Sequence, residues 1–86
     1  MRVEYKIIDP AGLHARPVSL MVDLAMKFDG EVSLIYKEKT VSVKSILSVM
    51  SLGIPVGESF AIEVSGDKSD SFVHQLTELL KEHNVV

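Results

Sequence analysis

One histidine in this 86-residue chain lies in a setting that suits phosphoryl chemistry. His14 belongs to the run Gly-Leu-His-Ala-Arg-Pro at positions 12–17, where an extended pattern ends and a helical one begins. Imidazole is a nucleophile near neutral pH, and the free N–H groups at a helix start, with the helix dipole, favour an anion. The planar guanidinium group of Arg16 carries a positive charge and several N–H donors that can bind phosphate oxygens. The run therefore predicts a phosphoryl acceptor with a phosphate clamp. From these residues alone, a helix-capping His14 beside a solvated Arg16 stays open as the alternative.

A serine heads a second segment of interest, at positions 45–52, which is short and mostly apolar. Ser45 suits a helix N-cap, and a phosphate added there would face the helix start. Leu47 and Met50 lie three residues apart, and they cannot both be buried easily with the other apolar residues of the segment. We expect an exposed apolar edge, which is typical of a docking surface. A plain N-cap and a loosely packed core edge remain the simpler interpretations.

Other classes of function find little support in the sequence. His74 and His83 are nine residues apart without acidic or cysteine ligands around them, so we interpret them as surface or boundary residues and expect no metal site. We find no nucleotide-binding glycine loop and no Ser/His/Asp order, and we expect no cofactor. The net charge of -3 argues against direct nucleic-acid binding. No apolar run is long enough to span a bilayer and no signal peptide is evident, so we expect a cytoplasmic protein without membrane insertion.

The elements that must position these residues follow from hydrophobic periodicity. Alternation predicts strands at residues 3–7, 32–36, 41–43 and 60–64, and helical spacing predicts helices at residues 15–28, 45–52 and 72–83. The order is β-α-β-β-α-β-α in one domain over residues 1–86. Each strand has one apolar face, which predicts a two-layer α+β fold: a four-stranded antiparallel sheet covered on one face by three helices.

Taken together, the two segments resemble the HPr family, the histidine-containing phosphocarriers of the bacterial phosphoenolpyruvate-dependent sugar phosphotransferase system (PTS). Residues 12–17 match the family's active-site motif, and residues 44–53, from Lys-Ser-Ile-Leu to Met-Ser-Leu-Gly, resemble its regulatory-serine segment. The interval between the segments and the order of elements also fit. The resemblance implies the HPr-like open-faced sandwich.

The resemblance also implies a role for individual residues. His14 would accept phosphate on Nδ1 from phospho-enzyme I and donate it to EIIA domains, as a stoichiometric carrier and not as an enzyme. Arg16 and the backbone N–H of Ala15 would hold the phosphate. HPr kinase/phosphorylase would phosphorylate Ser45, which slows transfer and creates a form that binds a catabolite-control transcription factor. Partner docking would involve Ser19, Leu47 and Met50.

Some positions depart from the family pattern. Ser48 stands where many relatives carry glycine or lysine, and Asp23 and Met26 stand where some enteric members carry lysines that face acidic partners. The cationic rim around His14 is therefore thin, which affects partner choice and association rate. Two alternatives remain: a regulatory protein that signals through phospho-Ser45 with a vestigial His14, and a carrier of a related dihydroxyacetone or nitrogen branch.

Overall fold

The structure, a computed structural model, describes residues 1–86 and contains four strands and three helices. In chain order these are β1 (Arg2–Lys6), α1 (Ala15–Met26), β2 (Glu31–Tyr36), β3 (Lys39–Ser42), α2 (Ile46–Met50), β4 (Ser59–Ser65) and α3 (Ser69–Glu82). The predicted order of elements is confirmed. Two helices are shorter than the periodicity indicated: α1 ends at Met26 instead of residue 28, and α2 is a five-residue helix.

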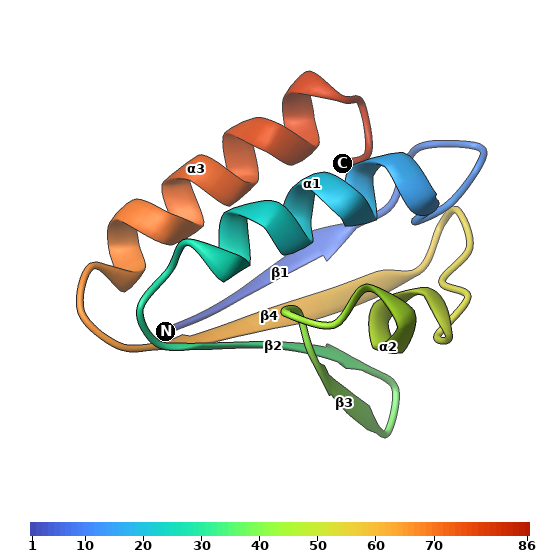
Figure 1. The fold of residues 1–86 in the computed structure, drawn as a ribbon. Helices are drawn as coiled ribbons and strands as arrows, with labels where there is room; N and C mark the ends of the chain where they lie inside the picture. Colours follow the sequence, from blue (N-terminus) through green and yellow to red (C-terminus); the bar gives the residue numbers. More distant parts are fainter.

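The four strands form one antiparallel sheet in the order β1-β4-β2-β3. Ile62 of β4 lies at the centre, opposite Val3 of β1 on one side and Leu34 of β2 on the other. Leu34 in turn lies opposite Val41 of the edge strand β3. Helices α1 and α3 lie side by side over the sheet, and α2 packs against α1 and β3 (Figure 1). The predicted α+β architecture is therefore confirmed.

The core lies between the sheet and the helices. Alternate residues of β2, namely Val32, Leu34 and Tyr36, point into it, as the period of a half-buried strand requires. Apolar residues from one face of each long helix complete the core: Val18, Met21 and Ala25 from α1, and Phe72, Val73, Leu76 and Leu80 from α3. No polar or charged residue is buried, so all the charged side chains are left at the surface.

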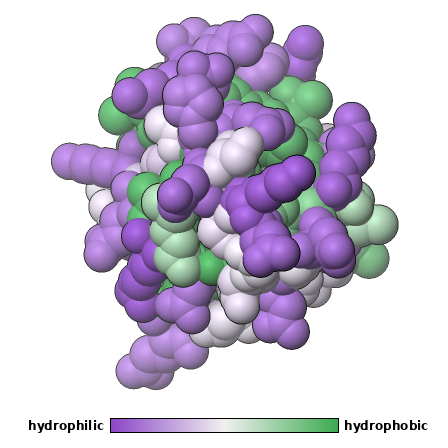
Figure 2. Space-filling model, turned by 90° about the vertical axis from the view of Figure 1, so that its left-hand side faces the viewer, coloured by the Kyte–Doolittle hydropathy of each residue, from purple (hydrophilic) through white to green (hydrophobic).

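Helix α1 runs from one end of the molecule towards the other (Figure 1). His14 lies at the end where α1 begins, beside the loop that follows β1 (Figure 1). The opposite end, where α1 finishes and α3 begins, presents mainly hydrophilic residues with small apolar areas between them (Figure 2). The largest exposed fraction among the bulky apolar side chains belongs to Leu47 of α2.

Candidate functional site

A tightly bonded loop connects β1 to α1 and carries the site. The Gly12 N–H donates to the backbone oxygen of Asp9 at 2.8 Å, and the Leu13 N–H donates to the Ile54 oxygen at 2.9 Å. The Leu13 side chain is buried in the core, which anchors the residue immediately before His14. Gly12 has φ +71, and a Cβ at this position would lie 2.6 Å from the Ile54 oxygen. The motif therefore needs glycine here both for its backbone conformation and for the close approach of the loop after α2.

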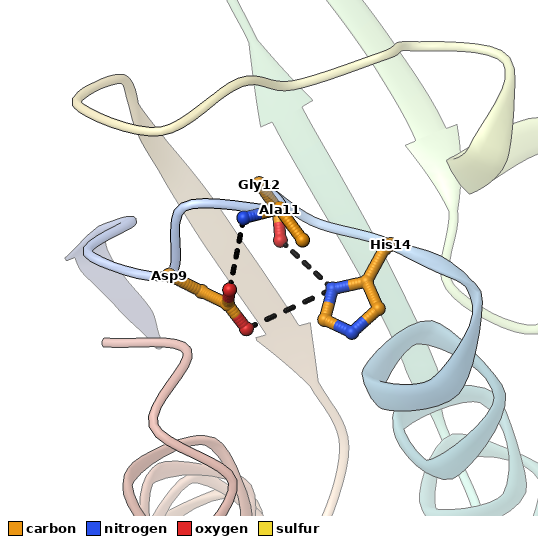
Figure 3. Close-up of polar contacts among 4 residues, drawn as sticks. All are labelled: Asp9, Ala11, Gly12 and His14. Carbon is orange, nitrogen blue, oxygen red and sulfur yellow. Dashed lines mark hydrogen bonds and ion pairs between the residues drawn. The ribbon is translucent and has the colours of Figure 1, made fainter.

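His14 occupies the N-cap position of α1, but its side chain does not cap the helix. Its backbone carbonyl accepts the first helical hydrogen bond, from the Val18 N–H at 3.2 Å. The imidazole is instead 41% exposed, with Nδ1 3.1 Å from the carbonyl oxygen of Gly12 and 3.8 Å from Oδ2 of Asp9 (Figure 3). The ring is thus held by the preceding loop while a large part of it stays open to solvent.

The start of α1 offers donors for an anion. The amides of Ala15 and Arg16 donate to no backbone carbonyl, and Pro17, which has no N–H, is buried as the third helical residue. The Arg16 side chain is exposed and forms no hydrogen bond or ion pair within the chain. Ser19 is also exposed, one turn further along the same helix. These residues can receive an oxyanion near His14 without breaking an existing contact.

The predicted N-cap at Ser45 is confirmed. Ser45 precedes α2 with an extended backbone, and its Oγ accepts from the Ser48 N–H at 3.3 Å. The neighbouring Lys44 donates from Nζ to the Phe28 carbonyl at 3.0 Å, which ties this segment to the end of the α1 region. Ser45 is half-buried, and its hydroxyl is engaged in the cap of α2.

The predicted exposure of the apolar edge of α2 is also confirmed. Leu47 is 81% exposed and Met50 is 37% exposed, whereas Val49 between them is 2% exposed and faces the core. Ile46 adds a third apolar side chain that is open to solvent. Leu47 is too open to be a loose edge of the core, whereas Ile46 at 41% and Met50 at 37% exposure also contact the fold. We name Ile46, Leu47 and Met50 the α2 apolar edge.

The structure does not gather the other histidines into a site. His74 lies on the surface of α3, where Nε2 is 3.2 Å from Oε1 of Glu78, and His83 is the half-buried C-cap of that helix. No group of three metal-ligating side chains is present, and no helix is long and apolar enough to cross a membrane. Asp23 and Met26 are exposed on α1.

One residue beside His14 was not identified from the sequence. Asp9 lies five residues earlier, in the turn that ends β1, and its carboxylate faces the imidazole (Figure 3). Its sequence signal is an aspartate that opens the turn Asp-Pro-Ala-Gly, a position where its side chain bonds the backbone two residues on.

The fold and the site together define a small α+β protein with an exposed imidazole at a helix start. The family model PTS-HPr, described as the PTS HPr component phosphorylation site, matches residues 1–82. The chain therefore belongs to the HPr family of phosphocarrier proteins.

Solved structures agree with this membership. The histidine-containing phosphocarrier protein of Mycoplasma superposes with a TM-score of 0.95 at 29% identity, over 100% of this chain and 98% of that one. HPr-C-His of Thermoanaerobacter tengcongensis gives a TM-score of 0.87 at 33% identity, over 95% and 92% of the two chains. The catabolite-repression protein Crh of Bacillus subtilis gives 0.73 at 29% identity, over 95% and 93%.

Proposed function

We propose that this chain accepts a phosphoryl group on His14 from phospho-enzyme I and passes it to EIIA domains of sugar permeases in the bacterial cytoplasm. The observation that carries the proposal is the His14 imidazole, which occupies a helix N-cap position, makes no capping bond and is 41% exposed. An open imidazole allows two successive partners to reach the same ring. In this role the chain is a stoichiometric carrier without turnover of its own.

The chemistry is a phosphoryl exchange between nitrogen and the donor. A lone pair of the His14 ring attacks phosphorus, the bond from phosphorus to the donor breaks, and that bond's electron pair stays with the donor. We assign the attack to Nδ1. The unpaired guanidinium of Arg16 and the free amides of Ala15 and Arg16 support a role in holding the phosphoryl oxygens.

The α2 apolar edge supports a docking role in the same exchange. A partner that covers Leu47 and Met50 removes apolar surface from water, and unbranched methionine adapts to partners of different shape. Ser19 lies exposed on α1 and would form the polar part of this surface.

We further propose that HPr kinase/phosphorylase modifies Ser45 and that the product is recognised by a catabolite-control transcription factor. A phosphate on Ser45 would lie at the start of α2, where the Ser48 N–H already points at Oγ. The added negative charge would oppose the approach of partners that themselves carry phosphate.

The decisive experiment is incubation with phosphoenolpyruvate and enzyme I, with intact mass measured before and after mild acid. We expect one acid-labile phosphate on the wild type and none on His14→Ala. His74→Ala is the matched control, because its imidazole is on the surface of α3, and it should be labelled like the wild type. Labelling that survives His14→Ala, or an acid-stable adduct, would overturn the assignment.

A second candidate, a regulatory protein that acts through phospho-Ser45 alone, is favoured by the similarity to Crh. The same experiment, run in parallel with an incubation with HPr kinase and ATP, separates the two. A wild type that enzyme I does not label, but that HPr kinase phosphorylates at Ser45, would support the regulatory candidate over the carrier.

A further inference from the structure

The carboxylate of Asp9 is fixed in place beside the His14 ring. Its Oδ1 accepts from the Ala11 N–H at 2.9 Å, and the backbone oxygen of Asp9 accepts from the Gly12 N–H at 2.8 Å. The side chain is only 19% exposed. Its second oxygen, Oδ2, lies 3.8 Å from Nδ1 of His14 (Figure 3). The loop therefore presents a negative charge to one particular nitrogen of the ring.

This arrangement decides which ring nitrogen carries the hydrogen. Two oxygen groups lie close to Nδ1, the Gly12 carbonyl at 3.1 Å and the Asp9 carboxylate at 3.8 Å, and both can only accept hydrogen bonds. A lone pair on Nδ1 would face two oxygens and be repelled by both. The neutral ring is therefore favoured with its hydrogen on Nδ1 and its lone pair on Nε2.

We propose that Asp9 is a positioning residue that restrains phosphorylation of His14: its carboxylate keeps the hydrogen on Nδ1 at rest and opposes a phosphoryl group on that nitrogen. The inference rests on the proposed function, because it concerns the nitrogen to which we assign the attack. It adds a restraint that the Gly-Leu-His-Ala-Arg-Pro motif does not itself contain.

The position of the hydrogen on Nδ1 affects how His14 can attack phosphorus. Attack by Nδ1 needs a lone pair there, so the hydrogen must first pass through water to Nε2, and the ring must give up its bond to the Gly12 carbonyl. The new N–P bond then brings phosphoryl oxygens towards the Asp9 carboxylate as the bond to the donor breaks. Two negative charges on the phosphoryl group, about 5 Å from a carboxylate at a partly solvent-exposed site, shift the phosphorylation equilibrium on the order of tenfold.

Asp9→Asn tests both halves of the proposal. The amide oxygen of asparagine can still accept from the Ala11 N–H, so the turn is retained, while the charge is lost and an NH₂ donor faces Nδ1. The matched control is Asp67→Asn, which removes the same charge from an exposed residue at the far end of the molecule. Asp9→Ser, whose hydroxyl also caps turns, provides a second uncharged variant should the amide disturb the loop.

The first measurement is the tautomer of His14, read from long-range ¹H–¹⁵N spectra of the unphosphorylated proteins at alkaline pH. We expect hydrogen on Nδ1 in the wild type and in Asp67→Asn, and a shift towards Nε2–H in Asp9→Asn. A wild-type ring with its hydrogen on Nε2, or an unchanged tautomer in Asp9→Asn, would overturn the positioning role.

The second measurement is the equilibrium phosphorylated fraction with enzyme I at fixed ratios of phosphoenolpyruvate to pyruvate. We expect Asp9→Asn and Asp9→Ser to shift this equilibrium about tenfold towards the phosphorylated form, and Asp67→Asn to leave it unchanged. Equal equilibria for all four proteins would refute the opposition to phosphate. Failure of enzyme I to label any of them would refute the proposed function, while the tautomer spectra would still decide whether Asp9 holds the ring.

Discussion

The substitution Leu47→Asp separates docking from folding, because the structure predicts a small cost for the free protein. Leu47 is 81% exposed, so folding buries only about a fifth of its side chain, which contributes about 0.3–0.6 kcal/mol. Aspartate has a lower helix propensity than leucine, by roughly 0.5 kcal/mol. Leu47 is the second residue of α2, where a carboxylate recovers about 0.3 kcal/mol from the helix dipole. The free energy of unfolding should fall by less than about 1 kcal/mol.

In the complex with enzyme I the same substitution should be costly. Covering the exposed four-fifths of Leu47 is worth about 1–2 kcal/mol, which aspartate loses. A carboxylate covered without a partner costs about 1–3 kcal/mol more. Even the lower sum, about 2 kcal/mol, corresponds to a roughly 30-fold rise in the KM for phosphoryl transfer from enzyme I.

The assay is the initial rate of His14 phosphorylation as the concentration of each variant is raised, together with urea denaturation of the same samples. Leu47→Asn keeps the polarity and size of aspartate without its charge, and should raise KM by a smaller factor. Thr40→Asp adds the same charge to the exposed outer face of β3, and should leave KM unchanged. A Leu47→Asp protein that is much less stable, or one that transfers phosphate with the wild-type KM, would refute the reasoning.

Four further predictions follow from individual residues. Arg16→Ala should slow phosphoryl transfer by about 10- to 100-fold, because it removes charge-assisted bonds to phosphate, while the unfolding free energy changes by less than about 0.5 kcal/mol, since the side chain is exposed and unpaired. Transfer kinetics and urea midpoints of one preparation test both statements, and an unfolded variant would make Arg16 structural. Phosphorylation of Ser45 adds a charge of about -1.5 to -2 and should slow labelling of His14 at low salt, with the inhibition fading as salt rises. Inhibition that is equally strong at high salt would indicate a steric block instead. Gly12→Ala should cost about 1–3 kcal/mol of stability and displace His14, because its Cβ would meet the Ile54 oxygen at positive φ; a variant that melts like the wild type would contradict this. Burial, partly offset by a hydrogen bond to a threonine hydroxyl, raises the pKa of Tyr5, so its contribution to stability is complete below about pH 10 and is lost as pH rises through the folded-state pKa. Urea midpoints across alkaline pH should therefore fall less steeply for Tyr5→Phe than for the wild type.

The local elements could be predicted from the sequence because each depends on neighbours along the chain. Alternation in residues 32–36 is enough to indicate a strand with one buried face, and Val32, Leu34 and Tyr36 are indeed the buried residues. Ser45 could be recognised as an N-cap because its Oγ bonds an amide only three residues away. The exposure of Leu47 could be predicted because so short and mostly apolar a helix cannot turn all of its apolar side chains towards the core.

The site required tertiary structure wherever its parts come from distant segments. The pairing of β4 with both β1 and β2 depends on contacts across the whole chain, and no local pattern encodes the order of strands. The loop before His14 is held by a hydrogen bond from the Leu13 N–H to the backbone carbonyl of Ile54. Ile54 lies forty-one residues beyond Leu13 in the sequence. Only in that folded loop does the Asp9 carboxylate come within 3.8 Å of Nδ1. Sequence therefore indicated the side chain that we propose as the phosphoryl acceptor, because that prediction depends on the chemistry of imidazole at a helix start. The fold decided which charge its nitrogen faces, because the distance between two side chains depends on every turn and hydrogen bond that connects them.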